Sequence, residues 1–199
     1  MGQRLVITVR KNDSDIATIY YHWSADSVSA LQEANDLVDY IKAYEIDKLE
    51  DIDDIQLKLI RFCEANGGGI SANDELYAKQ KFEGIHKFKD NKLVNRNYGL
   101  IDISENGMEY SKSWSEADVV IDLDNAIILN DVFFTCEDFE EFFEYYTDDL
   151  YTSIEEVPLY DCGDISNIKF DEINAVSDSL QSAPNVFKRN DGKIYLLIA

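Results

Sequence analysis

Residues 4–10 (RLVITVR) and 16–23 (IATIYYHW) are the stretch that decides the fold. Apolar and polar side chains alternate in the first segment, and the second is rich in β-branched and aromatic residues, so both are expected to be strands. The polar residues 12–15 between them (NDSD) favour a tight turn. We therefore expect an antiparallel β-hairpin at the start of the chain.

Apolar residues at helical spacing follow the hairpin. They predict one helix over residues 27–44, with Ser27 as its N-cap, a second over 49–65 and a short third over 73–82. The three glycines 67–69 end the second helix as a C-cap and linker, because the Gly-Lys-Ser/Thr of a phosphate-binding loop is missing.

From Gly99 onward the pattern is mainly that of strands. Asn106-Gly107 predicts a hairpin between residues 100–104 and 108–114, because Asn-Gly favours the positive φ angles of a type I′ turn. The remaining expected elements are strands at 118–123, 126–134, 186–188 and 194–198, and helices at 137–146 and 171–180. The sequence thus predicts an α+β fold, with mainly antiparallel sheets and packed amphipathic helices.

The triple glycine is also the best candidate for a domain boundary. It would separate an N-terminal region of a hairpin and two helices, residues 1–66, from a C-terminal α+β region with an acidic face, residues 70–199. One compact domain is the alternative, since 199 residues suit either organisation.

The charge is the most unusual property of the sequence. Forty Asp and Glu against eighteen Lys and Arg give a net charge of −22. Residues 113–168 contain sixteen Asp or Glu and no Lys or Arg, so this segment carries −16 of the total. Such a chain repels nucleic acid and anionic membranes and attracts basic surfaces.

The acidic residues are also arranged by face. Period-two alternation places Asp118, Asp122 and Asp124 on one side of the strand at 118–123. In the helix expected at 137–146, aromatic residues form one face and carboxylates the other. We expect a partner-binding surface made of Asp118, Asp122, Asp124, Glu137, Glu140, Glu141, Glu144, Asp148 and Asp149.

The stretch 118–149, above all Glu-Asp-Phe-Glu-Glu-Phe-Phe-Glu at 137–144, resembles the small acidic inhibitors that phages and mobile elements use against host nucleases. Anti-CRISPR and anti-restriction proteins of the DNA-mimic kind belong to this group. The resemblance implies a protein inhibitor that occupies the DNA or RNA channel of a basic nucleic-acid-binding protein, such as a restriction enzyme or Cas9.

Two alternatives remain. One is an immunity protein or antitoxin that neutralises a basic nuclease toxin, because complementary charge speeds that association in the same way. The other is a divalent-cation-binding protein or enzyme. Asp102-x-Ser104-x-Asn106-Gly107 resembles the opening of an EF-hand loop, but its twelfth position is Ser113 and the hairpin turn is preferred. The two histidines are far apart and belong to no catalytic motif, so we expect no enzyme, cofactor or metal.

Residues 79–96 form a basic counterpart with interleaved aromatic side chains. Such a segment can contact nucleic acid, the chain's own acidic face or another subunit. Because the net charge is −22, no direct nucleic-acid partner and no membrane partner is expected. No 18-residue apolar run and no signal peptide occur, and three widely spaced cysteines, Cys63, Cys136 and Cys162, do not suggest a disulfide framework. A reducing cytoplasm is the expected compartment.

Overall fold

The computed structural model describes residues 4–25, 27–82, 98–131, 154–156, 168–175, 186–188 and 194–197. Across these residues, no helix is both long enough and apolar enough to span a membrane.

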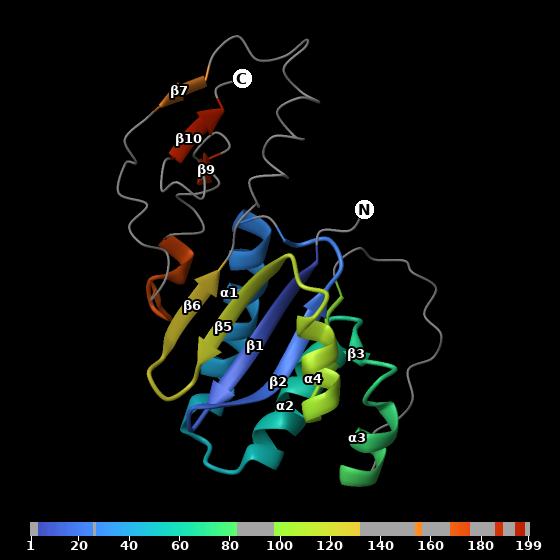
Figure 1. Ribbon diagram of the computed structural model, residues 1–199. Helices are drawn as coiled ribbons and strands as arrows, with labels where there is room; N and C mark the ends of the chain where they lie inside the picture. Colours follow the sequence, from blue (N-terminus) through green and yellow to red (C-terminus); the bar gives the residue numbers. More distant parts are fainter. Residues whose placement is uncertain are drawn as a thin grey trace.

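The N-terminal hairpin lies in the middle of a seven-stranded sheet (Figure 1). Strand β1 (Leu5–Lys11) pairs antiparallel with β2 (Ser14–Tyr21) and parallel with β5 (Ala117–Asp122). The strand order is β3-β4-β2-β1-β5-β6-β8. The outer strands are β3 (Gly69–Ile70), β4 (Leu100–Asp102), β6 (Ile127–Asp131) and β8 (Ile168–Lys169).

Antiparallel pairing dominates this sheet, as predicted. Parallel pairs join β1 to β5 and β3 to β4, while the other four neighbouring pairs of the described sheet are antiparallel. A separate antiparallel sheet contains β7 (Ile154–Glu156), β10 (Ile194–Leu197) and β9 (Val186–Lys188) in that order. The protein therefore has an α+β fold.

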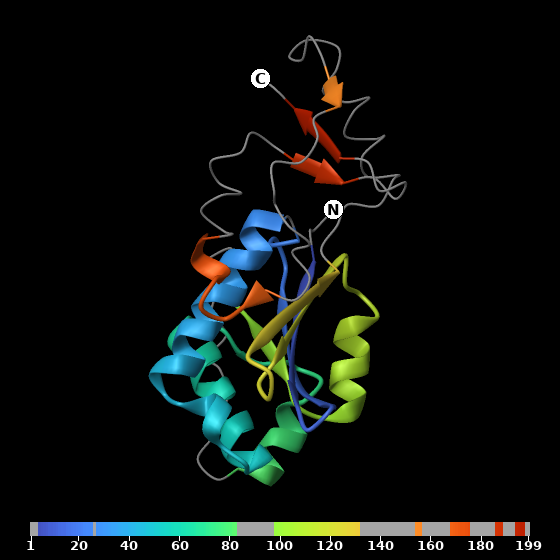
Figure 2. The same ribbon diagram turned by 90° about the vertical axis from the view of Figure 1, so that its left-hand side faces the viewer.

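Helices cover both faces of the large sheet (Figure 2). Helices α1 (Ser27–Ala43) and α2 (Ile52–Ala65) lie on one face, where they share a hydrophobic core with alternate strand residues such as Leu5, Ile7 and Val9. Helix α4 (Glu105–Lys112) lies on the opposite face and packs on β2. The 3₁₀ helix η1 (Ile46–Lys48) joins α1 to α2, and α3 (Glu75–Lys81) follows β3.

Local sequence signals account for most of these elements. The predicted helices at 27–44, 49–65 and 73–82 are confirmed as α1, α2 and α3, and the predicted strands at 118–123 and 126–134 as β5 and β6. The glycines end α2 as expected: Gly67 has φ 83°, and the amides of Gly67 and Gly68 donate to the carbonyls of Glu64 and Cys63. This is a Schellman C-cap.

The second predicted hairpin is wrong. Residues 105–112 form helix α4, in which Asn106 and Gly107 occupy the first turn. Ser104 is the N-cap, and its hydroxyl oxygen accepts a hydrogen bond from the amide of Gly107 at 3.1 Å. Asp74 binds the backbone amide of Ser104 at 2.6 Å, so a residue 30 positions away holds the start of the helix.

Two further predictions fall wholly or partly outside the described residues. The helix expected at 137–146 is one, and only residues 171–175 of the helix expected at 171–180 are described. The division into residues 1–66 and 70–199 stays a prediction. The large sheet takes strands from both sides of the glycine loop, because β4 pairs with β2.

The positive φ angles of the β1–β2 turn can be tested by mutation. Asn12 and Asp13 have φ angles of 52° and 58°, as a two-residue type I′ turn requires. Asp13→Val should lower the free energy of unfolding by about 1–2 kcal/mol, because a β-branched residue tolerates the left-handed region poorly. Asp13→Gly should cause no loss. Urea denaturation of both variants measures the difference, and equal stabilities would contradict it.

Helix α1 contains a carboxyl group in an unusual environment. Glu33 is half-buried, and its Oε1 accepts a hydrogen bond of 3.2 Å from the Ser24 hydroxyl. Burial raises the pKa of Glu33 to about 7; the Ser24 hydrogen bond opposes this shift and the charge of Asp36 adds to it. The folded protein therefore holds this proton more tightly than the unfolded chain does.

Stability should consequently depend on pH through Glu33. Between pH 4.5 and about 7 the folded state binds the extra proton, so this group's contribution to stability falls as the pH rises. In Glu33→Gln that decline should be smaller by about 1–2 kcal/mol, a figure reduced for the partial exposure of the group. Urea denaturation at pH 5 and pH 7.5 compares the two proteins. If the stability of both proteins changed equally with pH, the raised pKa of Glu33 would be contradicted.

Candidate functional site: an acidic end of the sheet

Parallel pairing of β1 with β5 brings the carboxyl ends of these two strands to the same edge of the sheet. β1 ends at Lys11 and β5 ends at Asp122. The β1–β2 turn, the β5–β6 turn and the connection from α1 to α2 come together there (Figure 1). Acidic segments far apart in the sequence are thereby placed side by side.

Lys11 lies at the centre of this arrangement. Its side chain is only 5% exposed, and its Nζ lies 2.8 Å from Oδ1 of Asp124. The same Nζ donates a hydrogen bond of 3.3 Å to the carbonyl of Asp47. The hydrogen bond to Asp124 raises the pKa of Lys11, burial opposes this rise, and the charges of Asp124, Glu50 and Asp47 add to it. The lysine is therefore held charged between two acidic segments.

We call the carboxylates of the three segments that meet at this edge the acidic end: Asp13 in the β1–β2 turn, Asp47 and Glu50 between α1 and α2, Asp122 at the end of β5, and Asp124 in the β5–β6 turn. Asp13, Glu50 and Asp124 are exposed, and the other two are half-buried. The neighbouring cations Arg10 and Lys48 are paired with Asp15 and Glu45, at 2.9 and 2.5 Å. Asp47, Glu50 and Asp124 act directly on Lys11, while Asp13 and Asp122 lie in or beside the two adjoining turns. The five carboxylates outnumber the one buried lysine, so this edge carries excess negative charge.

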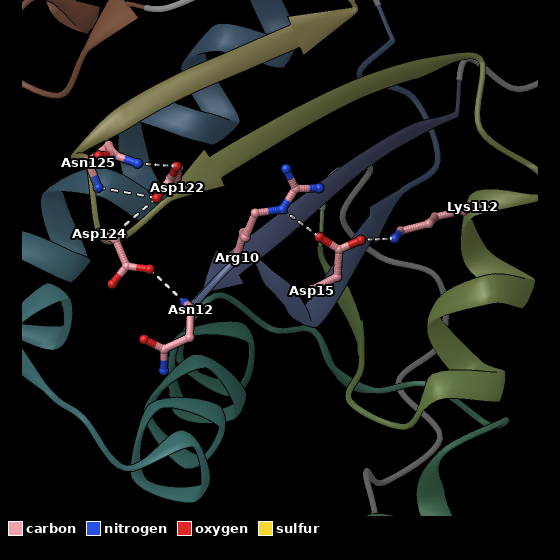
Figure 3. A network of polar contacts seen from close by, with 7 residues as sticks. All are labelled: Arg10, Asn12, Asp15, Lys112, Asp122, Asp124 and Asn125. Atoms are coloured by element: carbon pink, nitrogen blue, oxygen red, sulfur yellow. Dashed lines mark hydrogen bonds and ion pairs between the residues drawn. The ribbon is translucent and has the colours of Figure 1, made fainter.

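Asp122 shapes the turn that carries Asp124 (Figure 3). Its carboxylate accepts hydrogen bonds from the amide of Asp124 at 2.9 Å, and from the amide and side chain of Asn125 at 3.2 and 2.8 Å. Asp124 accepts a hydrogen bond of 2.6 Å from the amide of Asn12 in the other turn. Hydrogen bonds from Lys11 and Asn12 lower the pKa of Asp124. The two turns are therefore joined through Asp124, whose carboxylate stays ionised.

A neighbouring carboxylate shows the opposite arrangement. Asp15 lies between Arg10 of β1 and Lys112 of α4, with contacts of 2.9 and 2.5 Å (Figure 3). Burial raises the pKa of Asp15, but hydrogen bonds from Lys112 and Arg10 outweigh it and leave the pKa below its usual value. This charge is neutralised within the protein, so Asp15 is not part of the acidic end.

The predicted partner-binding residues divide into three groups. Asp122 and Asp124 lie together at the acidic end. Asp118 lies near the start of β5, where its side chain accepts a hydrogen bond of 2.8 Å from the Ser115 hydroxyl. The remaining six lie outside the described residues: Glu137, Glu140, Glu141, Glu144, Asp148 and Asp149.

Sequence reasoning missed the contribution of the α1–α2 connection. Residues 45–54 contain six Asp or Glu and one Lys, so acidic residues are about twice as dense there as in the segment 113–168. Its importance was not apparent because only the tertiary structure brings Asp47 and Glu50 to Lys11.

Part of the basic segment binds the chain's own carboxylates. Lys79 pairs with Glu75 in the preceding turn of α3. Lys81 lies 2.6 Å from Asp53 of α2. Residues 83–97 are outside the described part, so the three alternatives for this segment stay open for them.

The ion pair between Lys11 and Asp124 can be tested with a matched pair of variants. Asp124→Asn retains an acceptor for the Asn12 amide but leaves the buried Lys11 without its carboxylate, so the free energy of unfolding should fall by about 1–2 kcal/mol. Asp13→Asn makes the same change of charge at an exposed position and should alter stability by less than about 0.5 kcal/mol. Chemical denaturation at low salt measures both. Equal effects would show that Lys11 does not depend on Asp124.

No family model matches the chain. A search of curated proteins found no match, and neither did a search of solved structures.

Proposed function

We propose that this protein is an acidic inhibitor that binds a basic nucleic-acid-binding protein and occupies its DNA or RNA channel. The observation that carries the proposal is the acidic end, where five carboxylates come from three segments and three of them, Asp47, Glu50 and Asp124, act on one buried lysine. The segment 113–168, which contains two of these residues, adds −16 of the net charge of −22.

The proposed mechanism is electrostatic mimicry. Duplex DNA presents one negative charge per about 1.7 Å of its axis, and proteins that bind it line their channels with Lys and Arg. Carboxylates fixed by hydrogen bonds at the end of a sheet offer such a channel a rigid anionic surface, which lowers the entropy cost of binding. Asp122 and Asp124 are fixed in this way, whereas Asp13 and Glu50 remain exposed for contact.

The proposed setting is the reducing cytoplasm, where RNA-guided nucleases and restriction enzymes act. Cys63 is buried as a free thiol, and burial raises the pKa of that thiol, so it is a poor nucleophile and a poor disulfide partner. An RNA-guided nuclease such as Cas9 is our preferred target, because its guide and target channels are strongly basic.

The acidic end should determine affinity for such a target. Proteins captured from host lysate at 50 mM salt would be identified, and their affinity for the chain measured. The double variant Asp13→Asn, Glu50→Gln should bind at least tenfold more weakly. The control Glu105→Gln, Glu109→Gln makes the same change of charge on exposed positions of α4 and should bind nearly normally. Equal losses of affinity in the two double variants would show that binding depends on net charge alone.

Affinity should also fall by more than tenfold between about 50 and 200 mM salt, as it does for charge-dominated nucleic-acid interfaces. A second variant, with Glu137, Glu141 and Glu144 all changed to Lys, tests the predicted helix in the same assay and should abolish inhibition of the captured nuclease. Salt-independent affinity would contradict electrostatic mimicry. Inhibition that survives the triple change would remove that helix from the contact surface.

A further inference from the structure

Two aspartates lie buried together beneath helix α4. Asp74 and Asp102 are 1% and 0% exposed. Asp102 ends β4, and Asp74 immediately precedes α3. Gly107 of α4 packs against both: a Cβ at this position would clash with Oδ1 of Asp74 and lie 2.9 Å from Oδ1 of Asp102. The two carboxylates are therefore close neighbours, and any side chain at position 107 would enter the space between them.

Oxygen-bearing side chains complete this cluster. The hydroxyls of Ser71 and Ser111 donate hydrogen bonds to the two oxygens of Asp102. The hydroxyl of Ser104 donates to Asp74, which also accepts from the amides of Ile103 and Ser104. Each serine oxygen retains lone pairs after donating its proton. The cluster thus gathers two buried carboxylates, the buried hydroxyls of Ser71 and Ser111 and the hydroxyl of the half-buried Ser104.

The positive charge that would balance these carboxylates is missing from the described residues. No Lys or Arg there forms an ion pair with Asp74 or Asp102, and burying unpaired charges is costly. The N-terminus of a helix supplies only about half an elementary charge, so α3 and α4 together cannot offset two carboxylates.

Thr18 provides an independent sign of a missing ligand. It is fully buried and lies directly opposite Asp102 in the antiparallel ladder of β2 and β4, so both side chains project from the same face of the sheet. Among the residues that the structure describes, its Oγ1 has no hydrogen-bond partner. A buried hydroxyl without a partner is destabilising and uncommon in folded proteins. Its position beside the carboxylates fits a group that the polypeptide itself does not supply.

We propose that Asp74 and Asp102 bind one hard divalent cation, Mg²⁺ or Mn²⁺, with Ser71, Ser104, Ser111 and Thr18 as neutral oxygen donors. Two carboxylates balance the charge of one divalent ion, and a set made only of oxygens suits these ions and disfavours Zn²⁺ and Cu²⁺. The site uses none of the residues of the acidic end and does not depend on the proposed function. Asp102 and Ser104, considered above as part of a calcium loop, are two of the proposed ligands: Asp102 ends β4 and Ser104 is the N-cap of α4.

The test uses the full chain after removal of metal with EDTA. Mn²⁺ is added, and the free ion is measured by electron paramagnetic resonance. We expect one tightly bound Mn²⁺ per chain that Mg²⁺ displaces and that persists at 200 mM salt, unlike weak binding to surface carboxylates. Asp102→Asn should weaken this binding at least tenfold. Asp122→Asn, the same change at the acidic end, should leave it within twofold.

Two milder variants separate a metal site from a structural hydrogen-bond network. Thr18→Val keeps the shape of the side chain and removes only the unpartnered hydroxyl. If the cluster is only a hydrogen-bond network and Mn²⁺ binds elsewhere, this variant binds Mn²⁺ with unchanged affinity. The proposal predicts weaker binding. Ser111→Ala should also weaken binding, and circular dichroism checks that each variant is folded. Absence of a tight site, or a tight site unaffected by Asp102→Asn and Ser111→Ala, would overturn the proposal. Preference for Ca²⁺ over Mg²⁺ would overturn the choice of ion.

Discussion

The parallel pairing of β1 with β5 is the constraint on which the rest of the structure depends. β1 lies between its hairpin partner and a strand more than 100 residues later, so the sheet could not form from the hairpin alone. Because the two strands run in the same direction, both carboxyl ends reach one edge. There Lys11 meets Asp124, and the two turns are joined through the Asn12 amide.

The two faces of this sheet are built by different physical means. Alternate residues of β1 and β2 join α1 and α2 in an apolar core, where burial of hydrocarbon provides most of the stabilisation. Beneath α4 the sheet instead presents buried polar groups, including Thr8, Thr18 and Asp102. The Ser111 hydroxyl donates to Asp102 and the Ser104 amide donates to Asp74, so α4 is positioned by hydrogen bonds as well as by packing.

The carboxylates of the described residues differ in how far cations of the same chain neutralise them. Asp15, Asp53 and Glu75 are paired with cations of the same chain, which removes them from the surface available to a partner. The carboxylates around Lys11 exceed the positive charge that is present there. The proposed binding surface rests on this imbalance rather than on the net charge itself.

The sequence by itself determined the elements whose signals are local. The turn at Asn12-Asp13, the helices α1 and α2 and the glycine cap of α2 follow from backbone preferences and apolar periodicity over a few residues. Only the tertiary structure decided that Asn106-Gly107 belongs to a helix, because Asp74 holds the backbone at its start. The tertiary structure likewise brought Asp47, Glu50 and Asp124 to Lys11. The pairing of β1 with β5 that makes this possible leaves no periodic signal in the sequence of either strand.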